Sequence, residues 1–126
     1  WVIVYFYPKD ATPGCTKEAC NFRDGREVLV ASGAIVLGIS KDSVASHKKF
    51  ADAHNLNFTL LSDTSTETIQ AFGAWGKKKF MGREYMGIER NTSLINPSGE
   101  IVKEYIGVNP LTHVGELLKD LKDFSA

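Results

Sequence analysis

The chain has 126 residues, of which 43% are hydrophobic and 24% are charged. This length and composition suit a single globular domain spanning residues 1–126, and they exclude fibrous and disordered proteins. Fifteen basic and fifteen acidic side chains cancel each other, so we expect neither nucleic acid nor an anionic membrane surface as a partner. The longest apolar runs are also shorter than the roughly 18 residues that a membrane helix needs.

The first predicted element is a strand over residues 1–7, WVIVYFY. Its β-branched and aromatic residues show no polar alternation, which indicates a central strand buried on both faces. The chain opens inside this apolar run, and natural domains seldom begin in the middle of a buried strand. We therefore expect the natural protein to carry an N-terminal segment that this chain lacks.

A long helix is predicted over residues 12–32. Thr12 suits the N-cap, Pro13 suits the first helical position, and Gly33 follows the end of the helix. Apolar residues recur along it with the 3.6-residue period of a helix that packs on a sheet. The expected core face consists of Cys15, Ala19, Phe22, Leu29 and Val30.

The remaining pattern alternates strands and helices. Strands are predicted over 34–40 and 58–63, and a hairpin over 91–107; helices are predicted over 43–55, 66–74 and 110–124. The last helix should turn four residues toward the core: Leu117, Leu118, Leu121 and Phe124. The basic run at 77–79 is expected to be a solvated loop. This order predicts an α/β protein with a thioredoxin-like fold, a central mixed β-sheet flanked by helices on both faces.

The two cysteines both lie near the start of the long helix. Cys15 falls at its third position, where unpaired backbone N–H groups and the helix dipole favour an anion. That position also follows the carboxyl end of a central strand, where α/β sheets place their sites. Only the thiolate form of a cysteine is a competent nucleophile, so this placement indicates a reactive residue. The alternative is a buried cysteine that acts only as a small apolar side chain.

Cys20 lies five residues further along the same helix. Five helical residues separate two Cα atoms by roughly 8 to 9 Å, whereas a disulfide needs less than about 7 Å. The pair could therefore form a disulfide only if the first turns of the helix unwound. The spacing also differs from Cys-x-x-Cys, and the three histidines are scattered, so we expect no metal site.

The segment PKDATPGC resembles the Pro-x-x-x-Thr-x-x-Cys signature of peroxiredoxins at Pro8, Thr12 and Cys15. The longer run YPKDATPGCTKEACNFRD is similar to the bacterioferritin comigratory protein or PrxQ branch of that family. Similarity continues through ISKDSVASHKKFA, FTLLSD and MGIERNTSLINPSGEI, so it covers essentially the whole chain. The resemblance implies a peroxidase that reduces hydrogen peroxide and organic hydroperoxides with electrons from thioredoxin.

The resemblance also implies a role for each cysteine. Cys15 would be the peroxidatic cysteine that becomes a sulfenic acid, and Cys20 would be the resolving cysteine that condenses with it to an intramolecular disulfide. No cofactor is implied, because the thiol itself carries the redox change. Reduction of the disulfide requires an external thiolate, a step that suits a thioredoxin-like donor.

Four further residues match family positions. Thr12 would offer its hydroxyl to the thiolate and the peroxide, and Pro8 would shape the pocket and shield the sulfur from water. Arg90 aligns with the active-site arginine, and Glu18 with the acidic residue that orients it. Three of them also have a simpler interpretation: Thr12 as a helix cap, Arg90 as a surface cation, and Glu18 as a charge that complements the helix dipole.

Two other functions stay open at this point. One is a peroxidase that uses Cys15 alone, with a structural Cys20 and an outside thiol as reductant. The other is a thioredoxin-fold interaction module without turnover. The expectation is a monomer in the cytoplasm, because thiols that cycle need a reducing supply.

Overall fold

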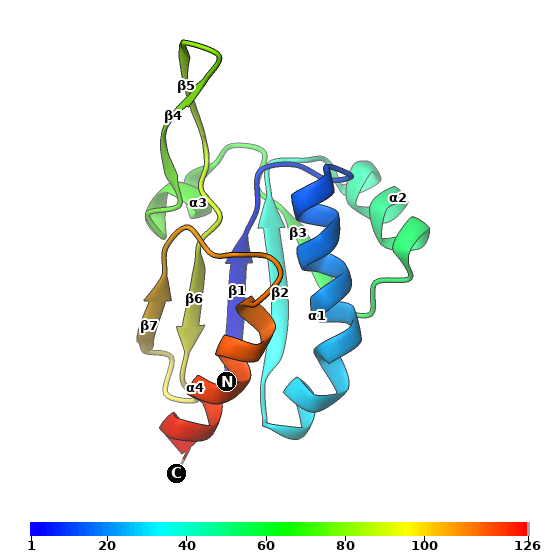
Figure 1. Ribbon diagram of the computed structural model, residues 1–126, viewed down its shortest axis with the longest axis vertical. Helices are drawn as coiled ribbons and strands as arrows, with labels where there is room; N and C mark the ends of the chain where they lie inside the picture. Colours follow the sequence, from blue (N-terminus) through cyan, green and yellow to red (C-terminus); the bar gives the residue numbers. More distant parts are fainter. Residues whose placement is uncertain (126) are drawn as a thin grey trace.

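Five strands form a mixed sheet in the order β3-β2-β1-β6-β7 in this computed structural model, which describes residues 1–125 (Figure 1). The strands of this sheet are β1 (Val2–Phe6), β2 (Ile35–Ser40), β3 (Thr59–Ser62), β6 (Thr92–Ile95) and β7 (Ile101–Tyr105). The helices are α1 (Pro13–Ala31), α2 (Val44–His54), α3 (Glu67–Ala71) and α4 (His113–Ser125). Strands β4 (Trp75–Phe80) and β5 (Arg83–Ile88) form a separate two-stranded sheet.

Strand β1 is the centre of the larger sheet and is buried on both faces, as predicted. It runs parallel to β2 and antiparallel to β6. Ile3 and Tyr5 point to one face and are at most 1% exposed, while Val4 and Phe6 point to the other and are at most 5% exposed. Because β1 ends at the loop that leads into α1, this rigid strand fixes where α1 begins.

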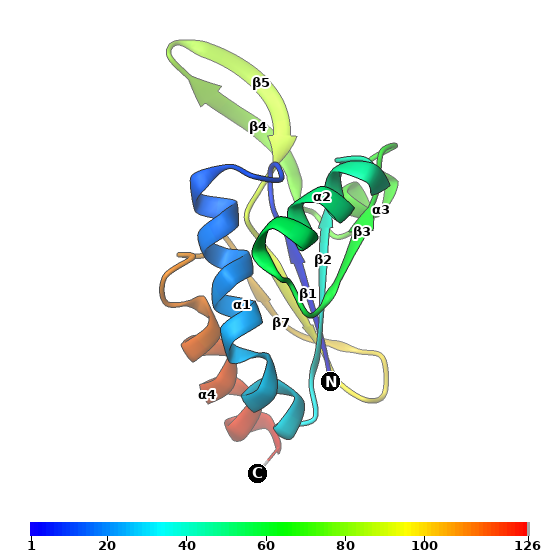
Figure 2. The same cartoon turned by 90° about the vertical axis from the view of Figure 1, so that its right-hand side faces the viewer.

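Helices cover both faces of the sheet, as the element order predicted (Figures 1 and 2). On one face, α1 and α4 lie side by side and pack on Ile3 and Tyr5 through Phe22 and Leu117. Helix α2 covers the β3 side of the same face. On the other face, Ile69 of α3 packs with Val4 and Phe6, side chains that point away from α1 because alternate residues of a strand face opposite sides.

The hairpin β4–β5 was not predicted, and it corrects the expectation that residues 77–79 form a solvated loop. Lys77, Lys78 and Lys79 belong to strand β4, which pairs with β5. The hairpin projects from the sheet (Figure 1), and its apolar residues Phe80, Met81, Tyr85 and Met86 are at least 50% exposed. They therefore show no regular apolar alternation. Its turn, Met81-Gly82, has positive φ at both residues, the geometry for which Asn-Gly is the usual signal.

Two residues expected in the core are exposed instead. Val30 is 47% exposed. A helix turns by about 100° per residue, and this rotation places Val30 at the margin of the buried stripe of α1. Glu18, at the opposite margin, is buried at 1% exposure. Phe124 is 45% exposed and stacks on Trp1 with ring centroids 6.0 Å apart.

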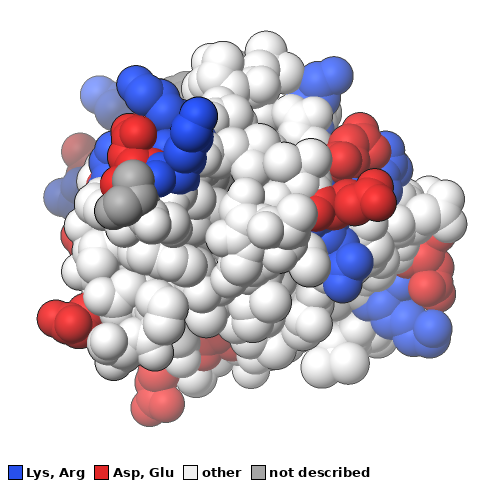
Figure 3. Space-filling view, turned by 90° about the horizontal axis from the view of Figure 1, so that it is seen from below, with Lys and Arg blue, Asp and Glu red and all other residues white. Residues whose placement is uncertain are grey.

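Apolar side chains are also exposed where α1 ends and β2 begins. Val28 and Ile35 are each 55% exposed there. Viewed from below, away from the hairpin, uncharged side chains cover the middle of this end and charged groups lie around it (Figure 3). Across residues 1–125, no helix combines the length and apolarity that crossing a bilayer requires.

Candidate active site

Cys15 is the third residue of α1 and is 1% exposed. The helix begins where the sequence predicted, with the extended backbone of Thr12 as N-cap and Pro13 as first residue. The N–H of Thr16 bonds to the Thr12 carbonyl at 2.8 Å, which closes the first turn around Cys15. The sulfur therefore lies at the positive end of a 19-residue helix.

Thr12 departs from the expected hydrogen bonding. Its hydroxyl donates to the Lys9 carbonyl at 2.8 Å and makes no cap bond to the helix. A hydroxyl has only one proton to donate, and the Thr12 hydroxyl donates it to the Lys9 carbonyl in the loop before α1. The expected donation from Thr12 to Cys15 would require a rotation of the side chain about Cα–Cβ.

Arg90 reaches Cys15 from a distant part of the chain. It follows β5 by two residues, and its guanidinium donates to the Cys15 sulfur from Nη2 at 3.3 Å. The same guanidinium donates from Nη1 to Glu18 Oε1 at 2.9 Å. The planar fork of arginine suits such a bridge between two hydrogen-bond acceptors. The structure thus brings together three of the predicted residues, Cys15, Glu18 and Arg90.

Burial shapes the charges of this group. It raises the pKa of Glu18 to about 7, even though the charge and hydrogen bond of Arg90 act in the opposite direction. Burial alone would lower the pKa of Arg90, but Cys15 and Glu18 bring it above its ordinary value. Glu18 Oε2 is buried without a hydrogen-bond partner among residues 1–125. Arg90 is thus a permanent cation beside Glu18, a carboxyl whose pKa of about 7 lets it gain or lose a proton near neutral pH.

A hollow of about 240 Å³ has half-buried Pro8 as one of its walls, and its lining includes neither Cys15 nor Arg90. The strand β5 residues Tyr85, Met86, Gly87 and Ile88 form another wall, together with three lysines, Lys9, Lys41 and Lys78. Burial, and next the charge of Arg90, lower the pKa of Lys78, which places this amine within the electrostatic reach of the site. The hairpin that sequence reasoning missed thus forms part of the wall of the hollow.

Cys20 lies on the same intact helix and is half-buried. Both thiols are free, as the helical spacing predicted for a folded α1. The side chain of Cys20 is thus more accessible to solvent than that of Cys15. Contact between the two sulfurs requires part of α1 to unwind.

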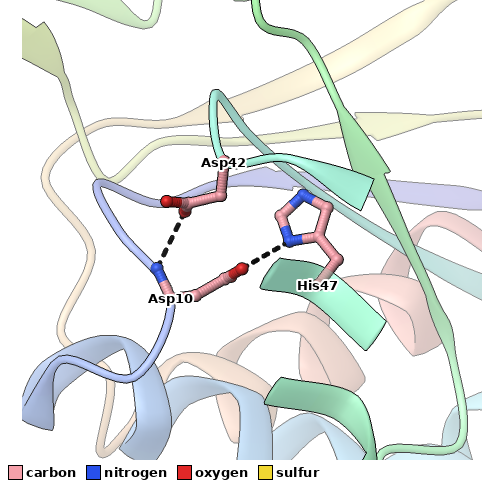
Figure 4. A group of neighbouring side chains, drawn as sticks. All are labelled: Asp10, Asp42 and His47. Atoms are coloured by element: carbon pink, nitrogen blue, oxygen red, sulfur yellow. Dashed lines mark hydrogen bonds and ion pairs between the residues drawn. The ribbon is translucent and has the colours of Figure 1, made fainter. Parts of the chain in front are cut away.

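One group within residues 1–125 has the composition of a metal site: Asp10, Asp42 and His47, whose ligand atoms lie within 4.8 Å of one another. Asp10 and His47 bond directly to each other at 2.7 Å. Asp42 accepts from the backbone N–H of Asp10 at 2.9 Å (Figure 4). It also accepts from the Ser40 hydroxyl at 2.7 Å. These atoms already serve as each other's partners, so the group does not fit a cation. Sequence reasoning missed it, because each residue alone is typical of a loop or helix surface.

Comparison with known proteins agrees with this geometry. Residues 1–104 match the model of the AhpC/TSA family. Peroxiredoxin Bcp of Bacillus subtilis is 49% identical over 125 residues, which are 99% of this chain and 80% of the relative. Peroxiredoxin Bcp of Escherichia coli is 44% identical over 122 residues, which are 97% of this chain and 78% of the relative.

Solved structures give the same result. The bacterioferritin comigratory protein of Xanthomonas campestris, studied for its alkyl peroxide reduction activity, superposes with a TM-score of 0.94 at 36% identity. The match covers 100% of this chain and 80% of that chain. A PrxQ mutant of Xylella fastidiosa superposes with a TM-score of 0.95 at 36% identity, over 100% of this chain and 78% of that one. The chain therefore belongs to the AhpC/TSA family and, within it, to the Bcp/PrxQ peroxiredoxins.

Proposed function

We propose that this chain is a thiol peroxidase in which the thiolate of Cys15 reduces hydrogen peroxide and organic hydroperoxides. The observation that supports this most directly is the contact of Arg90 Nη2 with the Cys15 sulfur at 3.3 Å. A fixed cation beside a buried sulfur at a helix N-terminus stabilises a thiolate.

The first step is displacement at the O–O bond. The thiolate attacks one peroxide oxygen, an S–O bond forms, and the O–O bond breaks. The electron pair leaves with the distal oxygen, which takes a proton from solvent and departs as water or an alcohol. Negative charge spreads from sulfur over both oxygens in the transition state, so a donor fixed beside them lowers the barrier.

Four residues assist this step in the proposal. Arg90 donates to the sulfur and to the reacting oxygens, and Glu18 holds the guanidinium through its 2.9 Å bond. Thr12 turns its hydroxyl from the Lys9 carbonyl toward the peroxide when substrate enters. Pro8 limits the access of water to the sulfur.

Cys20 completes the proposed cycle. Its thiolate attacks the sulfenic sulfur of Cys15, a disulfide forms, and the hydroxyl group leaves as water after taking a proton. A dithiol reductant of the thioredoxin class then returns both cysteines to thiols. This requires a reducing compartment, for which the cytoplasm is our proposal, and the monomer suffices because both cysteines lie on one chain.

A peroxide titration with thiol mapping tests this function. One equivalent of hydrogen peroxide should convert the reduced protein to a Cys15–Cys20 disulfide that thioredoxin reduces again. Cys20→Ser should still consume the first equivalent and stop at the sulfenic acid, and Cys15→Ser should be inert. A lasting sulfenic acid beside a free Cys20 in the wild type would instead favour the one-cysteine peroxidase. Equal, slow consumption by the wild type and Cys15→Ser would leave only the interaction module.

A further inference from the structure

A buried ion pair anchors the loop that precedes Cys15. Asp10 lies in this loop, five residues before the cysteine, and is 7% exposed. Its carboxylate accepts from the Tyr7 hydroxyl at 2.7 Å, from the Ser46 hydroxyl at 2.8 Å and from His47 Nδ1 at 2.7 Å. Ser46 and His47 belong to α2, so this carboxylate ties the loop to a second helix.

His47 is an imidazolium in this arrangement. Its Nε2 lies 3.0 Å from the Leu61 carbonyl, which can only accept a hydrogen bond. Its Nδ1 faces the Asp10 carboxylate, so both ring nitrogens must carry protons. Burial alone would lower the pKa of His47, but the bond to Asp10 raises it above its ordinary value. Burial alone would raise the pKa of Asp10, but the bonds from His47, Tyr7 and Ser46 hold it below its ordinary value.

The loop is held by its backbone as well. The N–H of Asp10 donates to Asp42 Oδ2 at 2.9 Å, and Figure 4 shows Asp10 bonded to both Asp42 and His47. The next residue, Ala11, has a φ of 63°, a left-handed conformation that costs a non-glycine residue free energy unless its surroundings impose it. Thr12, the N-cap of α1, follows directly. The anchor at Asp10 therefore holds a strained link to the first turn of α1.

We infer that Asp10 and His47 are positioning residues that keep the first turn of α1 folded and so control how often Cys20 can reach Cys15. This inference rests on the two-cysteine cycle proposed above. A sulfenic acid at Cys15 has two fates: condensation with Cys20, which needs an unwound turn, or attack on a second peroxide, which gives a sulfinic acid. A firm anchor favours the second fate, and a weakened anchor favours the first.

The test compares Asp10→Asn and His47→Gln with His54→Gln, a matched control at the other end of α2. Rapid mixing with excess hydrogen peroxide and quenching gives the rate of disulfide formation and the peroxide concentration that overoxidises half of the protein. Loss of one charge of a buried pair is strongly destabilising, so we expect both quantities to rise on the order of tenfold in the two anchor variants. His54→Gln should match the wild type. Ser46→Ala, which removes one of the bonds to Asp10, provides a milder variant if the others do not fold, with a rise of about threefold.

Amide hydrogen exchange over residues 13–20 of the reduced protein tests the anchor without any disulfide. We expect faster exchange there in Asp10→Asn, His47→Gln and Ser46→Ala than in the wild type and His54→Gln, because exchange reports local opening. Unchanged exchange in the folded anchor variants would overturn this inference, and so would disulfide rates equal to that of the wild type. A wild type that forms no Cys15–Cys20 disulfide would instead refute the two-cysteine cycle, while the exchange experiment would still decide the role of the anchor.

Discussion

Replacement of Arg90 by alanine is the sharpest test of the proposed chemistry. The guanidinium donates to Cys15 at 3.3 Å and to Glu18 at 2.9 Å, and its side chain is 18% exposed. Removal of one fixed donor from a developing oxyanion costs about 100- to 1,000-fold in rate, or about 2.7 to 4 kcal/mol. We therefore expect Arg90→Ala to slow the first peroxide step by on the order of a hundredfold or more.

The same substitution affects stability through Glu18. With 1% of its side chain exposed, Glu18 would lose its partner, and breaking a buried pair costs about 3 to 5 kcal/mol. The actual cost should be smaller at neutral pH, because Glu18, with a pKa of about 7, can take up a proton. In Glu18→Gln the side chain at position 18 carries no charge, so removal of Arg90 leaves no unpaired buried carboxylate. This variant is therefore the matched background for a double-mutant comparison.

The assay is single-turnover stopped flow with hydrogen peroxide, combined with urea unfolding of the four proteins. In the Glu18→Gln background, Arg90→Ala should cost less stability than in the wild type but should still slow the peroxide step by more than about tenfold. Rates within threefold of the wild type would show that Arg90 has no part in the chemistry. A rate loss that vanishes in the Glu18→Gln background would show that it came from the unpaired carboxyl and not from a missing donor.

Three further outcomes follow from single side chains. Between pH 4.5 and about 7, Glu18 binds more protons in the folded than in the unfolded protein; its contribution to stability therefore falls as the pH rises through this window. Urea unfolding at pH 5 and pH 8 should show the wild type losing up to about 3 kcal/mol relative to Glu18→Gln, and parallel profiles would contradict the burial argument. Gly14→Ala places a methyl group 3.1 Å from Arg90 Nη2, so it should slow the peroxide step by about threefold to tenfold, and an unchanged stopped-flow rate would mean that Arg90 adjusts freely. Gly38→Ala places its methyl group 2.9 Å from the Tyr5 ring and should cost about 1 to 3 kcal/mol in thermal unfolding, whereas a neutral result would mean that the sheet surface is loosely packed.

Sequence reasoning predicted every strand of the larger sheet and missed the hairpin β4–β5, which projects from it. Strand β1 can be predicted from its continuous apolar run, because both of its faces are buried. Strands β4 and β5 are mostly exposed, so their residues follow no apolar period, and Met81 occupies the turn position where Asn or Asp usually precedes the glycine. Periodicity reports burial, and it is therefore weak where a hairpin extends into solvent.

Local signals also identified only part of the site. The position of Cys15 follows from Thr12 and Pro13, which are its neighbours in sequence. Arg90 lies 75 residues from Cys15, and only the family resemblance connected them. No local signal joins Asp10 to His47, 37 residues away, because each is an ordinary polar residue of a loop or a helix until the fold brings them together.

The bond between Arg90 and the Cys15 sulfur has a consequence for the timing of the proposed cycle. A thiolate at the start of α1 is attracted both to the guanidinium and to the helix dipole, so its charge helps to hold the first turn in place. A sulfenic acid at the same position is neutral when it carries its proton, and both attractions weaken. Reduction of the peroxide thus weakens the electrostatic attraction that holds the first turn of α1 folded. In the proposed cycle, this is the step after which the turn must unwind so that Cys20 can reach Cys15.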